Sequence, residues 1–373
     1  MSLRIFLSPP QMGTKEQVYV KEVFESNYIA PLGEFVNRFE KAMSSYTHSP
    51  NALALNSGTS ALHLALRVSQ ITSGDYVLAS SFTFIGSIDA ILYQGAIPVF
   101  IDSDEDSWNL SPVLLEKALK ELFPKPKALI LTHLYGQCAK LDEIIALCKA
   151  YDVLLIEDAA ESLGAFYKGQ HTGTFGEFGA LSFNGNKIIT TSGGGMLLAK
   201  SQEKLNKARY YATQARDNQP YYEHQDYGYN YRLSNVCAAI GVGQLEEIEA
   251  KVAKRREIFS WYEELLRGEA VEFMPELPDT RGNRWLTTLR FNNPKANPLA
   301  LVDLLAQKGI ESRPLWKPMH LQPLFKKALS FCNGVSQNLF QSGICLPSGG
   351  ALSQNDVEEI ASYVKDYLKG IEC

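Results

Sequence analysis

Short apolar runs alternate with amphipathic segments in the first half of the chain. The apolar runs cover residues 52–55, 76–79, 97–101, 128–131 and 153–156, and segments of helical periodicity between them cover 60–68, 114–122 and 143–150. Continuous apolar strands separated by helices predict an α/β fold with a large, mostly parallel sheet covered on both faces. Ligands of such sheets gather at the carboxyl ends of the strands, so candidate chemistry is sought there.

The rest of the chain predicts flanking helices and a second unit. Residues 15–26 and 34–46 have helical patterns before the sheet, and residues 234–266 have the pattern of one long helix after it. Beyond Gly268 the pattern changes. It predicts a strand near 285–291 and helices near 299–308 and 355–368. We therefore expect a large domain with an N-terminal arm over residues 1–250 and a smaller C-terminal α+β domain over residues 251–373, divided inside the long helix.

Composition narrows the class of protein. The 373 residues are 45% hydrophobic and 21% charged with a net charge of −5, which is ordinary for a globular protein and gives no positive field for nucleic acid. The cysteines and histidines are scattered without metal-ligand spacing, and neither a signal peptide nor an apolar membrane span is apparent. We expect a soluble cytoplasmic protein without a metal, a membrane anchor or a nucleic-acid partner.

Two strand ends carry candidate ligand sites. The segment 56–60 (Asn-Ser-Gly-Thr-Ser) follows the first strand and opens a helix, where small residues let a phosphate approach the helix N-terminus. A plain helix cap is the alternative. Asp158 ends the strand that begins at Val153, and a buried acid needs a partner. It either faces a cationic ring nitrogen, which it keeps protonated, or caps a helix or faces water at an ordinary strand end.

Two further segments contain a lysine and a polar loop. Lys187 follows an apolar strand and precedes a glycine run, and a desolvated lysine in such a place loses its proton readily and can form a Schiff base. The alternative is an ordinary surface lysine. The segment 228–235 precedes the long helix. Its Asn230 and Arg232 either reach a bound anion or belong to an aromatic loop that ends in a helix cap.

In order and spacing, these four segments resemble the DegT/StrS-type family of nucleotide-sugar aminotransferases, a branch of the fold-type I enzymes that use pyridoxal 5′-phosphate (PLP). The resemblance covers essentially the whole chain and is densest from residue 27 to about residue 250. It includes the segments 35–39, 81–84, 134–137 and 173–176. It implies an aspartate-aminotransferase-like fold with PLP as cofactor.

The resemblance also implies roles for the matched residues. Lys187 takes the position of the lysine that binds PLP covalently, and Asp158 that of the acid paired with the pyridine nitrogen. Asn230 resembles the residue that reaches the phosphate of the neighbouring subunit, so the chain is expected to act as a homodimer with shared sites. The remaining cofactor contacts implied are Gly58, Thr59 and Ser182 around the phosphate and Phe84 against the ring.

One position departs from the commonest family pattern. Glu161 stands where many relatives have Gln or His. A second carboxylate beside the phenolic oxygen of the cofactor is repulsive unless it is protonated or turned away. Glu161 is therefore a cofactor-binding candidate whose state the sequence leaves open.

The resemblance implies amino transfer from L-glutamate to a keto sugar, with the freed Lys187 amine carrying the proton. Segments 8–10, 26–33 and 313–320 are similar to those of the family branch that serves UDP-N-acetylbacillosamine synthesis. That branch aminates a UDP-linked 4-keto-6-deoxy-N-acetylhexosamine for bacterial protein glycosylation. The candidate substrate contacts are Arg232, Trp316, Lys317 and His320, although packing roles are the alternative for the last three. An enzyme for another keto sugar, for example a dTDP-linked one, and a non-catalytic PLP-binding regulatory protein remain alternatives.

Overall fold

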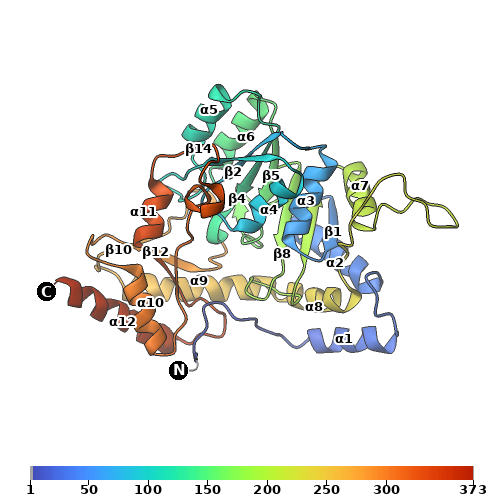
Figure 1. Cartoon of the computed structure of the whole chain (residues 1–373). Coiled ribbons are helices and arrows are strands. Elements are labelled where there is room, and N and C mark those ends of the chain that lie inside the picture. The colour runs from blue at the N-terminus through green and yellow to red at the C-terminus, as the bar shows by residue number, and fades with distance from the viewer. Residues whose placement is uncertain (1–2, 373) are drawn as a thin grey trace.

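An eight-stranded sheet forms the centre of the computed structural model, which describes residues 3–372 (Figure 1). Five neighbouring strand pairs are parallel, and the two pairs that involve β9 are antiparallel. The predicted mostly parallel sheet is thereby confirmed. In spatial order the strands are β1 (Asn51–Leu55), β9 (Gly195–Ala199), β8 (Phe178–Ser182), β5 (Leu154–Asp158), β4 (Ala128–Thr132), β2 (Tyr76–Ser80), β3 (Ile97–Ile101) and β14 (Ser330–Phe331).

Helices cover both faces of this sheet because strand side chains alternate between the faces. In β1, Leu53 and Leu55 pack with α3, α4 and α7, whereas Ala52 and Ala54 pack with α2 and α8. Helices α5 and α6 cover the second face beside β2, β4 and β5, and α1 lies against α8. The helices are α1 (Glu16–Glu25), α2 (Glu34–Thr47), α3 (Gly58–Val68), α4 (Ile85–Tyr93), α5 (Pro112–Glu121), α6 (Leu141–Ala150), α7 (Gln202–Ala212) and α8 (Asn235–Glu246).

The single long helix predicted over residues 234–266 is wrong, because the chain forms two helices there. Helix α8 ends before Glu247, whose φ of −105° and ψ of 8° are not helical, and α9 (Ile248–Leu265) follows at once. Helix α8 packs against α1 and α2, whereas α9 packs against α12 (Gln354–Glu372). No glycine or proline marks the break between residues 244 and 250, so the sequence pattern did not reveal it.

A second, antiparallel sheet lies in the C-terminal part of the chain. Its core includes residues of α9, α10 and α12, and Ile5 of the N-terminal segment joins it. The predicted division at residue 250 falls inside α9 and stays a prediction. The remaining elements are β10 (Val271–Phe273), β12 (Thr287–Phe291), β15 (Gly343–Leu346), β13 (Arg313–Pro314), α10 (Pro298–Gln307) and α11 (Val335–Ser342), with the small sheet β11 (Thr280–Arg281), β6 (Phe166–Tyr167) and β7 (Gln170–His171), and the 3-10 turns η1 (Leu134–Gly136), η2 (Met319–Leu321) and η3 (Pro323–Phe325).

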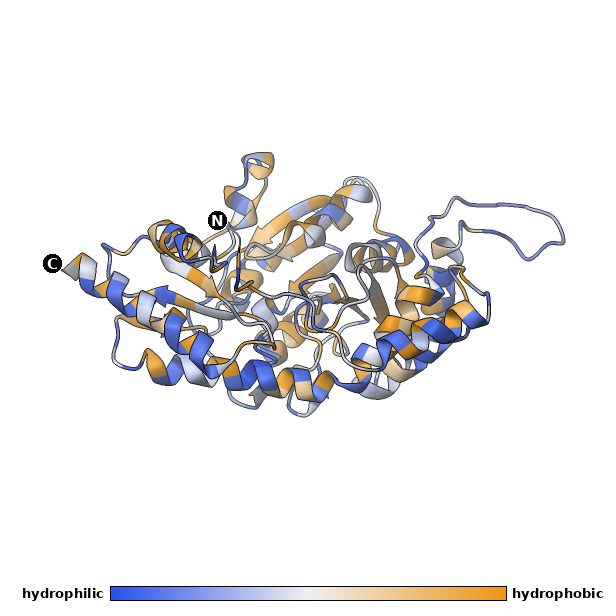
Figure 2. Ribbon diagram, turned by 90° about the horizontal axis from the view of Figure 1, so that it is seen from below, coloured by the Kyte–Doolittle hydropathy of each residue, from blue (hydrophilic) through white to orange (hydrophobic). Residues whose placement is uncertain are grey.

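The surface differs from the interior in hydropathy. Figure 2 shows hydrophobic strands at the centre and outer helices whose hydrophilic and hydrophobic residues alternate. The segment between α7 and α8 projects away from the body of the molecule in both views (Figures 1 and 2). Within residues 3–372, no helix is both long enough and apolar enough to span a membrane.

Candidate active site

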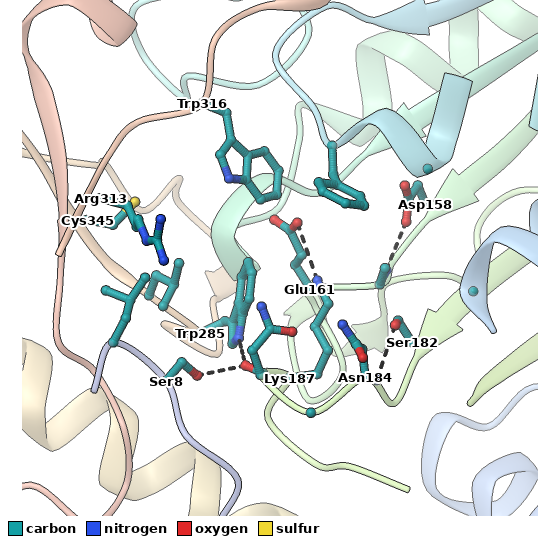
Figure 3. A pocket seen from close by; sticks show the side chains of 18 of the residues that line it. Ser8, Asp158, Glu161, Ser182, Asn184, Lys187, Trp285, Arg313, Trp316 and Cys345 are labelled. Atoms are coloured by element: carbon teal, nitrogen blue, oxygen red, sulfur yellow. Dashed lines mark hydrogen bonds and ion pairs between the residues drawn. The ribbon is translucent and has the colours of Figure 1, made fainter. Parts of the chain in front are cut away.

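A cavity of about 1160 Å³ opens where the carboxyl ends of β5 and β8 meet the start of α3. The N-terminal segment 6–10 and the segments 285–286 and 311–317 complete its wall (Figure 3). The cavity therefore lies at the carboxyl ends of strands, as expected for ligands of a parallel sheet. Nine of the predicted site residues line it: Gly58, Thr59, Phe84, Asp158, Glu161, Ser182, Lys187, Trp316 and Lys317.

Lys187 extends into this cavity from the turn that follows β8. Its Nζ lies 4.0 Å from the centre of the Trp285 ring and 3.6 Å from Oε1 of Glu161 (Figure 3). The peptide just before the lysine is fixed, because the carbonyl oxygen of Asn186 accepts hydrogen bonds of 2.7 Å from Ser8 Oγ and from Trp285 Nε1. The lysine side chain is only 12% exposed, so its amine is partly desolvated and aimed at the cavity.

Glu161 is buried beside this amine, and its second carboxyl oxygen is also held. Oε2 accepts a 2.6 Å hydrogen bond from the backbone N–H of Tyr135, whose φ of 52° is in the left-handed region. Burial raises the pKa of Glu161 to about 7. The charge of Asp158 acts in the same direction and that of Lys187 in the opposite one. The carboxyl therefore faces the lysine and is not turned away.

Asp158 ends β5 as a buried carboxylate at the floor of the cavity. Its oxygens accept hydrogen bonds from Ser87 Oγ and from the backbone N–H of Ala160. No Lys, Arg or His within residues 3–372 forms an ion pair with it. A buried carboxylate without a cation is costly, so this site fits a ligand that brings a positive charge, such as a pyridinium nitrogen.

The start of α3 forms an anion site in the same cavity. Ser57 caps the helix by accepting the N–H of Ser60, and the first N–H groups of a helix have no partner within it. A Cβ added to Gly58 would lie 3.2 Å from Cβ of Ser182, so glycine lets the helix start approach the end of β8. With Thr59 beside them, these groups fit a phosphate.

An aromatic face lies near the anion site and the lysine. Phe84 precedes α4 and is 58% exposed, although it lines the cavity. Its ring centre is 5.8 Å from that of Trp316. Such an exposed ring offers a surface for a planar heterocycle. The residues present therefore fit PLP, with Lys187 for the aldehyde, Asp158 for the ring nitrogen and the start of α3 for the phosphate.

Three predicted residues do not line the cavity. Asn230 is exposed, and its carbonyl oxygen accepts a 3.3 Å hydrogen bond from the side chain of Asn56. Arg232 forms an isolated bridge with Leu55, and its buried Nε has no hydrogen-bond partner among the described residues. His320 lies outside the wall, where its Nδ1 is 2.6 Å from Ser81 Oγ. Substrate contact by His320 is therefore not supported within this chain.

Sequence reasoning did not single out three residues of the site. Trp285 contacts Lys187, Tyr135 holds Glu161, and Arg313 lines the rim. Trp285 lies almost a hundred positions from Lys187 in the sequence, so no local pattern joins them. Tyr135 belongs to the segment 134–137, which carried the resemblance without a role.

The fold and the cavity define a PLP-dependent enzyme of fold-type I. The sequence profile of the DegT/DnrJ/EryC1/StrS aminotransferase family matches residues 10–365, and the chain belongs to this family of PLP-dependent sugar aminotransferases.

Known relatives align with this chain over nearly its full length. EpsN of Bacillus subtilis (strain 168), named as a pyridoxal phosphate-dependent aminotransferase, is 50% identical over 364 residues, covering 95% of this chain and 94% of EpsN. GDP-perosamine synthase of Escherichia coli O157:H7 is 34% identical over 358 residues, covering 96% of this chain and 97% of the relative. Spr1654 of Streptococcus pneumoniae, described as a sugar aminotransferase and solved in its PLP form, superposes with a TM-score of 0.91 at 25% identity and covers 100% of both chains.

Proposed function

We propose that this enzyme transfers an amino group from L-glutamate to the C4 keto group of a nucleotide-linked 4-keto-6-deoxy sugar. The observation that carries the proposal is that one cavity holds the Lys187 amine, the start of α3 and the carboxylate of Asp158, which forms no ion pair within residues 3–372. The first candidate substrate is a UDP-linked 4-keto-6-deoxy-N-acetylhexosamine of a bacillosamine-type pathway for protein glycosylation. The resemblance of segments 8–10, 26–33 and 313–320 supports it.

The chain supplies the proton transfers and the positioning. PLP, when bound, supplies a ring that withdraws electrons from the α-carbon of the donor. Asp158 keeps the ring nitrogen protonated, because its buried carboxylate favours a cation beside it. Nζ of Lys187 takes the proton from the α-carbon of glutamate and later returns one to the sugar carbon. Bonds from Ser8 and Trp285 to the Asn186 carbonyl hold the lysine turn in place.

The rim has the chemistry for a nucleotide diphosphate. Arg313 and Lys317 are cations on the cavity wall. Trp316, which lies between them in the sequence, lines the same cavity. Cations bind phosphate oxygens, and an aromatic ring offers a surface for stacking. The cavity volume of about 1160 Å³ slightly exceeds the usual range of ligand pockets, which suits a cofactor and a large second ligand together.

A GDP-linked keto sugar is the second candidate. The 34% identity with GDP-perosamine synthase over 96% of this chain favours it. Turnover of matched UDP-linked and GDP-linked 4-keto-6-deoxy sugars, with L-glutamate as donor, separates the two candidates. Turnover of neither sugar by the PLP-loaded protein would favour another keto sugar or the non-catalytic alternative.

Two copies of the chain are proposed to share each active site. Asn230 is exposed and off the cavity of its own chain, as a residue that serves a neighbouring site must be. The projecting segment between α7 and α8 also exposes Tyr221, Tyr222 and Tyr227, and large apolar surface of this kind is typical of contacts with a partner. A homodimer is the simplest arrangement that uses both features.

An absorbance spectrum tests the class of chemistry first. The PLP-loaded protein is expected to show the long-wavelength band of lysine-bound cofactor, and L-glutamate should replace it with a band at shorter wavelength. Lys187→Ala should lack the first band, whereas Lys326→Ala, which changes an exposed lysine, should keep it. A wild-type band that glutamate leaves unchanged would contradict glutamate as the donor.

A further inference from the structure

Glu161 is a buried carboxyl directed at the amine that carries out the proposed chemistry. We propose that Glu161 is the proton partner of Lys187: it is ionised while the lysine carries its charge and becomes a neutral acid when the lysine loses that charge. The inference deepens the proposed function and rests on it for its catalytic meaning. It starts from the 3.6 Å between Lys187 Nζ and Glu161 Oε1 inside the cavity.

Among residues 3–372, two charged side chains act on Glu161, and one of them is positive. Asp158 is the other acid that acts on it, and Lys187 is the one cation that acts on it among the described residues. Tyr135 and Cys345 lie close by, but burial raises the pKa of both, to about 12 for Cys345, so they are uncharged near neutral pH. The ionisation of Glu161 therefore depends on the charge of the lysine.

Removing the lysine charge leaves the Tyr135 N–H as the remaining group that favours the carboxylate among the causes acting on Glu161. Burial and the charge of Asp158 both raise the pKa of Glu161, and Lys187 alone of the two charged neighbours lowers it. The pKa is about 7 with the lysine charged, so it rises further when the lysine is neutral. Glu161 then holds a proton at neutral pH.

The proton exchange is balanced within the pair. An N–H bond of Lys187 Nζ breaks, an O–H bond forms at Glu161 Oε1, and the electron pair of the broken bond stays on nitrogen. The pair is neutral overall before and after, so no net charge is left in the partly desolvated cavity. The 3.6 Å separation exceeds a hydrogen bond, and a rotation of the flexible lysine chain or one bridging water closes it.

The backbone of Tyr135 keeps the carboxyl in position for this exchange. Its N–H donates to Oε2 at 2.6 Å and so leaves Oε1 toward the lysine. The tyrosine hydroxyl in turn accepts a 3.0 Å hydrogen bond from the backbone N–H of Trp316 on the rim. Glu161 is therefore held on the floor through a residue that also contacts the rim.

Infrared difference spectroscopy tests the proposal without turnover. Each protein is compared with the same protein carrying Glu161→Gln, so that the carbonyl band of the protonated Glu161 carboxyl is isolated. In wild-type protein without cofactor, this band is expected to disappear as the pH is raised, with a midpoint near pH 7. In Lys187→Met the midpoint should rise by roughly 1–3 pH units, because an opposite charge has been removed. Lys187→Arg keeps a positive charge and should stay near the wild-type midpoint.

Two results would overturn the proposal. One is a Lys187→Met midpoint at or below the wild-type value, and the other is a Glu161 carboxyl that stays ionised down to its ordinary pKa of about 4.3. Because the infrared measurement needs neither donor nor sugar, its failure leaves the aminotransferase proposal standing.

Discussion

The floor and the rim of the cavity are built in different ways. The floor consists of the ends of β5 and β8 and the start of α3, and the β5–β8 register sets Asp158 opposite Ala180. The rim consists of residues 6–10 and 311–317, whose one strand, β13, has two residues. Asp158 is 6% exposed, whereas the side chain of Arg313 is 66% exposed. Groups that must keep one geometry stand on the rigid sheet, and groups that meet a variable ligand stand on exposed segments.

Substitution of a residue on the floor should lower activity the most. Asp158→Asn keeps the size of the side chain and removes its charge, so the ring nitrogen loses its protonating partner. We expect kcat to fall on the order of 10²–10⁴-fold, the range typical of a lost proton-handling group. The matched control, Asp142→Asn, changes a carboxylate that is 60% exposed on α6 and should leave kcat unchanged. A loss of less than about tenfold in Asp158→Asn would contradict the assigned role.

Shared sites predict that two inactive variants complement each other. Lys187→Ala and Asn230→Ala should each be nearly inactive alone, because the first lacks the amine and the second weakens the partner's phosphate site. After mixing and subunit exchange, half of the dimers are hybrids, and each hybrid has one intact site. About a quarter of the wild-type activity should return. Gel filtration reports the assembly, and a mixture that stays inactive despite subunit exchange would exclude a site shared in this way.

The sequence predicted the floor far better than the rim. The runs at 52–55, 76–79, 97–101, 128–131 and 153–156 correspond to β1–β5, and the motifs after these strands lie together because strand ends meet at one edge. Contacts between distant segments could not be predicted in this way. Trp285 precedes β12 of the second sheet and contacts Lys187 only in the folded chain. No sequence periodicity predicts that contact.

Substitutions in the rim should weaken binding of the nucleotide sugar and leave the reaction with L-glutamate unchanged. Lys317→Ala and Arg313→Ala each remove a cation from the cavity wall. We expect the KM for the nucleotide sugar to rise roughly tenfold in each, equivalent to about 1.4 kcal/mol of phosphate binding. The spectral change on adding L-glutamate should keep its rate, because no nucleotide takes part. Lys326→Ala is the control for charge. A slower glutamate step in either rim variant would remove the distinction between floor and rim.

Substitution of His320 is expected to have the smallest effect on activity. It tests whether the sequence alone identified the substrate-binding residues of the rim correctly. The three-residue turn η2 places its ring against Ser81, where burial lowers the pKa and keeps the ring neutral near neutral pH. A neutral ring outside the cavity has no charge to offer a phosphate. His320→Ala should therefore leave the KM for the nucleotide sugar unchanged and cost about 1 kcal/mol of stability for the lost hydrogen bond. Ser81→Ala removes this bond and also the 3.3 Å hydrogen bond that Ser81 Oγ accepts from the backbone N–H of His320, so it should lower the melting temperature by at least as much. If His320→Ala raised the KM while Ser81→Ala did not, the histidine would act on the substrate, and the rim would extend beyond the cavity wall.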